Sequence, residues 1–300
     1  MIPTELASLR ISWRENVPLA GRTTLKIGGP ARVFAEVEDV PALVGLLHWA
    51  RARKLPVLPL GKGSNILIPD EGFPGVAVVL AGDFGRVEIR GTEVVAGAGA
   101  SLMSLAVLAQ RAGLSGLEGL SGIPSSVGGA VRINAGAYGA EIFDLLSSVE
   151  VVARTGELRD VPASEIAHGY RWSALMETDD LIASAALRLK EADPETIRAR
   201  MEDITVKRKK ALPPQPNAGS IFKNPPGDHA GRLLEACGLK GRRIGGAEVS
   251  PLHANVIVNL GGATARDVRA LMAEMQRVVK ERFAIDLVPE IEVLASASVE

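Results

Sequence analysis

The chain has 300 residues, of which 47% are hydrophobic and 4% aromatic, and its formal net charge is −1. This length can bury a large core and suggests two or three lobes, whereas duplex nucleic-acid binding usually needs a basic face that a near-neutral chain does not suggest. The single cysteine, Cys237, excludes an intramolecular disulfide, and no Cys or His pair has the spacing of a metal site.

The N-terminal segment does not read as a signal peptide, because Glu5, Arg10 and Arg14 interrupt its apolar residues. No run of about eighteen apolar residues, the length that a membrane-spanning helix needs, occurs anywhere in the chain. We therefore expect a cytoplasmic protein without membrane insertion.

The first elements are a strand, a helix and a second strand. Residues 31–37 alternate between apolar and polar side chains, which predicts a strand with one polar face. Pro41 begins an amphipathic helix that ends near Lys54, and residues 56–60 predict a buried strand.

A glycine turn, Gly61-Lys62-Gly63-Ser64-Asn65, leads from this strand to another at residues 66–68. Such a turn between strands resembles a phosphate cradle, but it has neither the third glycine of a Rossmann fingerprint nor the Gly-Lys-Ser/Thr of a P-loop. A nucleotide bound here would sit in a different fold. An ordinary hairpin turn is the structural alternative.

The most unusual stretch is residues 113–139, where eight glycines alternate with apolar residues and small hydroxyls. Glycine loses much backbone entropy on ordering, so this density needs a reason: turns with positive φ, or main chain close to a flat or anionic ligand. The hydroxyls of Ser121, Ser125 and Ser126, with the N–H groups around Gly128 and Gly129, would suit phosphate. A surface crossing with glycines only in turns is the alternative.

The remaining pattern favours an α+β fold, because single helices interrupt the strands without strict βαβ alternation. Three prolines within residues 212–216 indicate a lobe boundary. The other expected strands are 76–80, 87–90, 93–96, 149–153, 181–189 and 254–259, and the other expected helices are 101–111, 194–210, 230–236 and a long one from Thr264.

Two segments carry a family resemblance. Leu120-Ser-Gly-Ile-Pro-Ser-Ser-Val-Gly-Gly-Ala-Val131 and Asn134-Ala-Gly-Ala-Tyr-Gly139 resemble the flavin-binding core of UDP-N-acetylenolpyruvoylglucosamine reductases. Three shorter motifs of that family follow in order: Tyr170-Arg171, Ala218-Gly219-Ser220 and Pro289-Glu290. The chain departs from the family pattern at Lys62, Gly119, Ser125-Ser126 and Asn217. The short interval between Arg171 and Ser220 resembles the branch without an inserted substrate-capping loop.

The resemblance implies an α+β flavoenzyme in three parts. Residues 1–70 and 71–211 would form two lobes of an FAD-binding unit of the vanillyl-alcohol-oxidase type, and residues 212–300 a C-terminal α+β substrate lobe. The implied reaction is the NADPH-dependent reduction of UDP-N-acetylglucosamine enolpyruvate to UDP-N-acetylmuramate in peptidoglycan synthesis. A monomer that binds FAD, NADPH and a UDP-sugar is expected, without a bound metal.

The same resemblance implies the site residues. Arg171, Ser220 and Glu290 would be catalytic, and Tyr170, Lys207, Lys223 and Asn224 would bind substrate, although the basic run 207–210 could equally face water. The implied FAD-binding residues are Gly61, Gly63, Ser64, Asn65, Gly122, Ile123, Pro124, Ser125, Ser126, Gly128, Gly129, Asn134, Gly136, Tyr138 and Gly139.

Chemistry gives the three catalytic residue types a rationale. Hydride addition to the substrate's methylene carbon leaves negative charge on the carbon that bears the carboxylate, and Arg171 offers a fixed charge matched to it. Ser220 would return a proton to that carbon. Glu290 could assist if protonated, so we expect its pKa to be raised.

Two other functions remain open from the sequence. One is another FAD oxidoreductase on the same fold, such as an oxidase that uses oxygen. The other is a non-catalytic protein that binds a UDP-sugar or flavin. Serine-nucleophile catalysis is disfavoured, because no Gly-x-Ser-x-Gly elbow is present.

Overall fold

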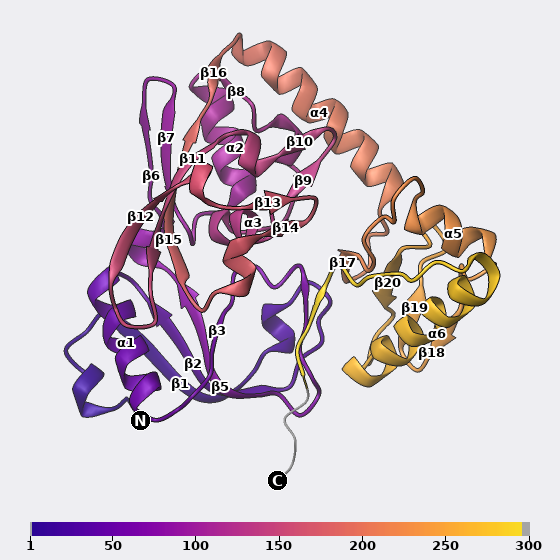
Figure 1. The fold of residues 1–300 in the computed structure, drawn as a ribbon, viewed down its shortest axis with the longest axis horizontal. Helices are drawn as coiled ribbons and strands as arrows, with labels where there is room; N and C mark the ends of the chain where they lie inside the picture. The colour runs from indigo at the N-terminus through magenta and orange to yellow at the C-terminus, as the bar shows by residue number, and fades with distance from the viewer. Residues whose placement is uncertain (1, 296–300) are drawn as a thin grey trace. The chain divides into compact units, whose positions relative to one another are not determined.

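The computed structural model describes residues 2–295, and their helices and strands are labelled in Figure 1. The chain divides into two compact units. Unit 1 comprises Met1–Glu15, Val33–Lys62 and Pro74–Val206, and unit 2 comprises Asn16–Arg32, Gly63–Phe73 and Lys207–Glu300. Both units therefore take chain from more than one segment. The lobe boundaries expected after residues 70 and 211 stay predictions.

The first sheet belongs to unit 1 for most of its length. Its strands lie in the order β1-β2-β5-β3, and β3 pairs with β5 in parallel, with Val57 opposite Val76. Helix α1 (Val40–Ala52) starts where the Asp39 carboxylate accepts the N–H of Ala42, and its leucines are buried in this unit's core. The strands are β1 (Ile11–Pro18), β2 (Pro30–Val37), β3 (Val57–Pro59) and β5 (Phe73–Leu80).

The second sheet of unit 1 is antiparallel, in the order β12-β11-β15-β7-β6. Its strands are β6 (Val87–Arg90), β7 (Glu93–Gly97), β11 (Leu146–Val152), β12 (Leu158–Pro162) and β15 (Leu181–Arg188). The short helix α3 (Val127–Arg132) packs on β15 and β7, and α2 (Leu102–Arg111) lies beside it (Figure 1). The core between them consists mainly of Ala, Val and Leu, as the composition suggests.

Three two-stranded ribbons complete unit 1, followed by the long helix α4 (Pro194–Ala211). The ribbons are β8 (Leu114–Ser115) with β16 (Lys190–Glu191), β9 (Gly136–Ala137) with β10 (Ala140–Glu141), and β13 (His168–Gly169) with β14 (Trp172–Ser173). Short 3-10 helices occur at Thr4–Leu6, Ala20–Arg22, Gly82–Gly85, Glu118–Leu120, Ile142–Asp144, Ala163–Glu165 and Ala174–Glu177.

Unit 2 packs two helices, α5 (Ala230–Ala236) and α6 (Ala265–Phe283), against a four-stranded sheet in the order β17-β20-β19-β18. Helix α6 buries Leu271 and Met275 and starts at a capping box of Thr264 and Asp267. The strands of this sheet are β17 (Asn217–Ser220), β18 (Arg243–Ile244), β19 (Ala247–Val249) and β20 (Val256–Asn259). Unit 2 also contains a separate parallel pair of strands, β4 (Ile66–Leu67) and β21 (Glu292–Val293).

The glycine turn 61–65 does not close a hairpin, so that alternative is wrong. The strand before it, β3, pairs with β5, whereas the strand after it, β4, pairs with β21 near the end of the described chain. The turn carries the chain from unit 1 into unit 2. Helix α3 was also not expected from the sequence, because glycine has a low helix propensity.

Glu118 is a buried acid at the start of a 3-10 helix, with 4% of its surface exposed. Its carboxylate accepts the hydroxyl hydrogen of Ser115 at 2.6 Å and the N–H of Gly116 at 2.7 Å. Burial opposes ionisation, but the hydrogen bonds from Ser115 and from backbone N–H groups outweigh it, so the pKa of Glu118 lies below its usual range. The charged form therefore stabilises the folded state.

We predict that Glu118→Gln lowers the free energy of unfolding at pH 7 by about 1–3 kcal/mol, since the new amide NH₂ faces a hydrogen-bond donor. The stabilisation from a depressed pKa exists above the unfolded value and is lost as pH falls through the folded value. Urea denaturation between pH 7 and 3 should therefore show wild type losing stability more steeply than the variant. Parallel curves would contradict this assignment.

Leu271→Ala should lower the free energy of unfolding by about 2–5 kcal/mol, because it leaves a cavity beneath α6. Leu252→Ala is the matched control in the same unit, since Leu252 is 49% exposed. That control should change stability by less than about 0.5 kcal/mol. Urea denaturation followed by circular dichroism measures both, and equal losses would contradict the assigned core.

Candidate cofactor and catalytic residues

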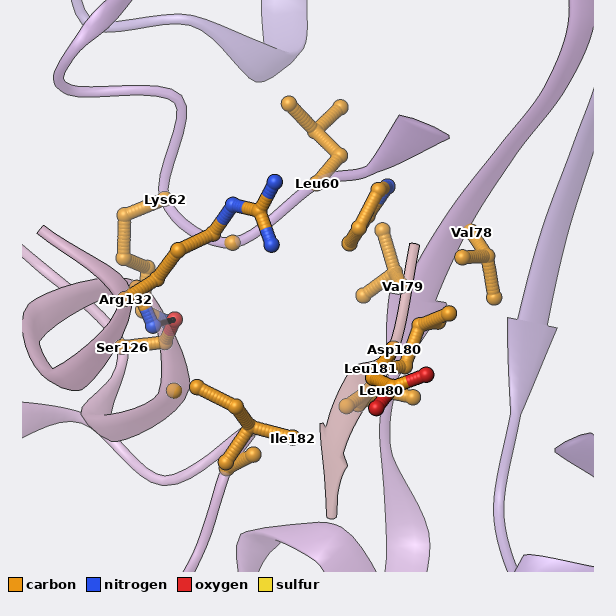
Figure 2. Close-up of a pocket in the computed structure, with 16 residues that line it drawn as sticks. Leu60, Lys62, Val78, Val79, Leu80, Ser126, Arg132, Asp180, Leu181 and Ile182 are labelled. Carbon is orange, nitrogen blue, oxygen red and sulfur yellow. Dashed lines mark hydrogen bonds between the residues drawn. The ribbon is translucent and has the colours of Figure 1, made fainter. Parts of the chain in front are cut away.

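A cavity of about 160 Å³ lies within unit 1, where the residues after β3 meet β5, the start of β15 and helix α3 (Figure 2). Apolar side chains such as Leu60, Val79 and Ile182 form its walls. Lys62, Arg132 and Asp180 supply its charged groups. Predicted site residues Gly61, Ser126, Gly128 and Gly129 line the same cavity.

Three lining glycines allow main-chain segments to touch. A Cβ added to Gly61 would lie 2.5 Å from the Ser126 hydroxyl oxygen, one on Gly99 would lie 2.2 Å from the Leu80 carbonyl oxygen, and one on Gly128 would lie 2.8 Å from the Cβ of Ala98. Real Cβ atoms do not approach so closely, and the backbone oxygen of Leu80 cannot move aside as a flexible side chain can. Part of the glycine density is therefore a requirement of packing.

The N–H groups at the start of α3 are already bonded to protein atoms. Gly128 donates to the Ala98 carbonyl at 2.9 Å, and Gly129 donates to the Ser126 hydroxyl oxygen at 3.2 Å. In this structure both N–H groups therefore have acceptors within the protein. Without side chains, the two glycines can still lie close to a ligand, so their assignment to FAD stays a prediction.

The cavity fits part of an FAD molecule. A cavity of about 150 Å³ can hold one benzene-sized ring, so this one has room for a ring or a phosphate group rather than the whole dinucleotide. Its apolar walls suit a flat ring, and Lys62 and Arg132 suit the negative charge of a diphosphate. Arg132 donates to the carbonyls of Leu175 and Met176, which fixes its side chain.

The predicted turn residues are shared between the units. Gly61 belongs to unit 1, whereas Gly63, Ser64 and Asn65 belong to unit 2. Gly63 has a φ of 61°, and its carbonyl accepts the N–H of Thr24 at 3.0 Å. The Asn65 amide donates to the backbone carbonyl of Glu290 at 3.2 Å, so it supports a predicted catalytic residue.

The segment before α3 and the one after it differ in exposure. Gly122 and Ile123 are half-buried, Pro124 is exposed, and Ser125 is buried with its hydroxyl bonded to the Ser126 carbonyl. Beyond α3, Tyr138 and Gly139 are exposed at the turn of the β9–β10 ribbon. Their assignment to FAD binding stays a prediction.

Asn134 is fully buried and its side chain is committed to protein groups. Its amide donates to the Glu141 carboxylate at 2.8 Å and to the Gly169 carbonyl at 2.9 Å, and its oxygen accepts the N–H of Phe143. This pattern favours a structural role over the predicted direct contact with FAD.

Arg171 lies at the two-residue turn between β13 and β14, next to Tyr170. Its φ is 54°, the left-handed region that non-glycine residues seldom adopt. The guanidinium donates to the Gly136 carbonyl, and its carbon lies 4.9 Å from the centre of the Tyr170 ring. A strained backbone and an anchored head are typical of a residue held for function.

Ser220 and Glu290 are brought to neighbouring segments within unit 2. Ser220 ends β17, and the next residue, Ile221, accepts the N–H of Glu290 at 2.8 Å. Asn255 clamps the adjoining Phe222, because its side-chain oxygen accepts the Phe222 N–H and its amide donates to the Phe222 carbonyl. Gly219 has a φ of 73° and open space around it, which leaves the Ser220 strand end uncrowded.

Three of the predicted substrate residues, Lys207, Lys223 and Asn224, belong to unit 2. Lys223 donates its backbone N–H to Val288, two residues before Glu290, and Asn224 accepts the N–H of Ala230 at the start of α5. Lys207 is exposed on α4. Arg171 and Tyr170 belong to unit 1.

Sequence reasoning missed Arg132, Asp180 and the Ala98–Gly99 segment of the cavity. Arg132 gave a weak signal, as the one cation within an apolar glycine-rich stretch. Asp180 directly precedes the buried strand β15, and its carboxylate accepts a hydrogen bond from Arg159 at 2.6 Å. Among residues 2–295, no cluster of His, Cys, Asp or Glu is placed to hold a metal, and no helix is long and apolar enough to span a membrane.

Comparison with known proteins supplies two family matches. The family model described as the FAD binding domain matches residues 31–162, and that of the C-terminal domain of UDP-N-acetylenolpyruvoylglucosamine reductase matches residues 211–294. These matches confirm the predicted fold, an FAD-binding unit of the vanillyl-alcohol-oxidase type followed by a C-terminal α+β lobe.

Individual relatives agree over nearly the whole chain. A protein named UDP-N-acetylenolpyruvoylglucosamine reductase 2, from Symbiobacterium thermophilum, is 42% identical over 93% of this chain and 91% of its own. The reductase of Caldanaerobacter subterraneus is 41% identical over 93% and 92%. The crystal structure of the Thermus caldophilus reductase is 42% identical, with a TM-score of 0.83 over 96% of this chain and all of that one. The chain therefore belongs to the UDP-N-acetylenolpyruvoylglucosamine reductase family.

Proposed function

We propose that this protein reduces UDP-N-acetylglucosamine enolpyruvate to UDP-N-acetylmuramate, with FAD as cofactor and NADPH as hydride donor. This reaction supplies a precursor of peptidoglycan. Family membership over 93% of the chain carries the proposal. The three side chains that the chemistry needs, Arg171, Ser220 and Glu290, are all present.

The cavity of unit 1 would hold part of FAD, with Lys62 and Arg132 towards its negative charge. When bound, FAD accepts a hydride from NADPH and delivers it to the methylene carbon of the substrate's enol ether. The residues of the chain position the reactants and stabilise the charge that develops. Other FAD contacts would come from the turn residues 61–65 and from residues 122–129.

Arg171 would stabilise the charge that develops on the substrate carboxylate. A guanidinium presents parallel N–H groups that match two carboxylate oxygens, and it stays charged at every physiological pH. Its contacts with Gly136 and Tyr170 fix the charge before substrate arrives, so little reorganisation is needed during the reaction.

Ser220 would donate the proton that completes the reduction. An alkyl hydroxyl is a weak acid, but the carbanionic carbon left after hydride transfer is a strong base, so the transfer is favourable. Glu290, on the adjoining segment, would assist if protonated or would orient another donor. Lys223 and Asn224 from the same unit, with Tyr170 and Lys207, would bind the UDP-sugar.

The expected state is a cytoplasmic monomer, without nucleic-acid or membrane partners. The near-neutral net charge of −1 supports the absence of a nucleic-acid role. The cytoplasm is also the compartment in which a nucleotide sugar and NADPH are both available to an enzyme.

The decisive experiment follows the flavin absorbance of the purified protein without oxygen. NADPH should bleach the absorbance, and the enolpyruvyl UDP-sugar should restore it, because the two half-reactions are separable in time. Product analysis should then show UDP-N-acetylmuramate. A protein that takes up no FAD would contradict the proposal, and a protein reoxidised only by oxygen would favour an oxidase.

Ser220→Ala should leave the bleaching by NADPH unchanged, because proton donation belongs to the second half-reaction. Formation of product should slow by about 10²- to 10⁴-fold, the usual contribution of a general acid. Stopped-flow absorbance with quenched-flow product analysis measures the two steps, and the first step serves as the internal control. Equal losses in both steps would rule out Ser220 as the proton donor.

A further inference from the structure

The guanidinium of Arg171 contacts both strands of the β9–β10 ribbon. Gly136 and Glu141 are cross-strand partners in this ribbon, and both reach the same side chain. Arg171 donates through Nη2 to the Gly136 carbonyl, and its Nη1 lies 3.9 Å from Oε1 of Glu141. Backbone and carboxylate therefore contact two different nitrogens of one planar group.

We infer that Glu141 is a positioning residue for Arg171, which holds the guanidinium in the orientation that the substrate carboxylate needs. This inference rests on the proposed function of Arg171. Glu141 itself belongs to none of the predicted catalytic, cofactor or substrate residues.

Asn134 connects the carboxylate to the turn that carries Arg171. One amide group donates both to Oε2 of Glu141 at 2.8 Å and to the carbonyl of Gly169 at 2.9 Å. Asn134 itself is fully buried, so breaking these bonds would leave its amide without partners. The position of the Glu141 carboxylate and the position of the Tyr170–Arg171 turn are thus set by the same side chain.

The contacts among Gly136, Glu141 and Arg171 require a glycine at position 136. An added Cβ would lie 2.8 Å from the backbone oxygen of Ala140, 2.9 Å from Cγ of Glu141 and 3.0 Å from Nη1 of Arg171. The ribbon backbone or the side chains of Glu141 and Arg171 would have to shift to make room for it. The presence of Asn134 and Gly136 in the motif therefore has an explanation that does not involve direct contact with FAD.

These contacts also explain how Arg171 keeps a positive φ. A φ of 54° is disfavoured for a residue with a Cβ, and it persists only where the surroundings determine it strongly. Hydrogen bonds hold Gly169, two residues earlier in the chain, and the guanidinium itself. The turn thereby presents Arg171 in one conformation.

The rival explanation is purely structural. Glu141 also takes part in a capping box with Asp144 at the 3-10 helix Ile142–Asp144, so its loss could loosen the ribbon alone. Glu141→Gln discriminates between the two roles. The glutamine keeps the length of the side chain and one acceptor oxygen, but it removes the negative charge beside Arg171.

The test is a double-mutant cycle of Glu141→Gln and Arg171→Ala in the FAD-loaded enzyme. The rate of flavin reduction by NADPH and the limiting rate of reoxidation by the enolpyruvyl UDP-sugar are measured separately by stopped flow. Glu157→Gln is the matched control, since Glu157 is an exposed carboxylate in the same unit. Flavin content and melting temperature are recorded for every variant.

Glu141→Gln should slow reoxidation about 10- to 100-fold, the loss expected when a reacting group is misplaced. It should leave reduction by NADPH, flavin content and the control variant unchanged. In the Arg171→Ala background the same substitution should have no further effect, because the guanidinium that Glu141 orients is absent.

The inference is overturned if Glu141→Gln costs as much in the Arg171→Ala background as in wild type. It is also overturned if the variant matches wild type, slows both half-reactions or loses flavin. Failure of the proposed function looks different, because wild-type enzyme itself would then not be reoxidised by the enolpyruvyl UDP-sugar.

Discussion

Close contact between main-chain segments is the constraint on which the cavity of unit 1 depends. Gly61 meets Ser126, Gly99 meets the Leu80 carbonyl, and Gly128 meets Ala98, each at a distance that excludes a Cβ. The cavity exists because these segments approach without side chains between them, while larger residues such as Leu60 and Ile182 form its walls. Glycine here is a packing residue first, and it leaves space for a ligand as a consequence.

In both units a buried asparagine amide holds separate backbone segments together. Asn134 joins Glu141 to the Gly169 carbonyl in unit 1, and Asn255 holds both backbone groups of Phe222 in unit 2. A hydrogen-bonded amide in the interior is costly to disrupt, since its partners would be left unsatisfied. In each unit such an amide lies beside a proposed catalytic residue, which limits the freedom of Arg171 or Ser220.

Regular periodicity made most helices predictable, because the apolar faces of α1, α2 and α6 repeat with the helical period and end at recognisable caps. Strand partners could not be read in the same way, so the parallel pairing of β4 with β21 was missed. The motif residues were found through family resemblance. Arg132 and Glu141 were not, because their roles depend on neighbours distant in sequence, Leu175 and Arg171.

Unit 2 is assembled from three separated pieces of chain, and this has a consequence for how it can form. Asp70 accepts the N–H groups of Ala265 and Arg266, and Asn259 donates to the carbonyl of Leu25. Contacts that close such long loops are slow to form and must await synthesis of the distant partner. During translation, residues 16–32 and 63–73 can form contacts with one another, such as that of Thr24 with Gly63, but their partners in the last third of the chain are absent until that part leaves the ribosome.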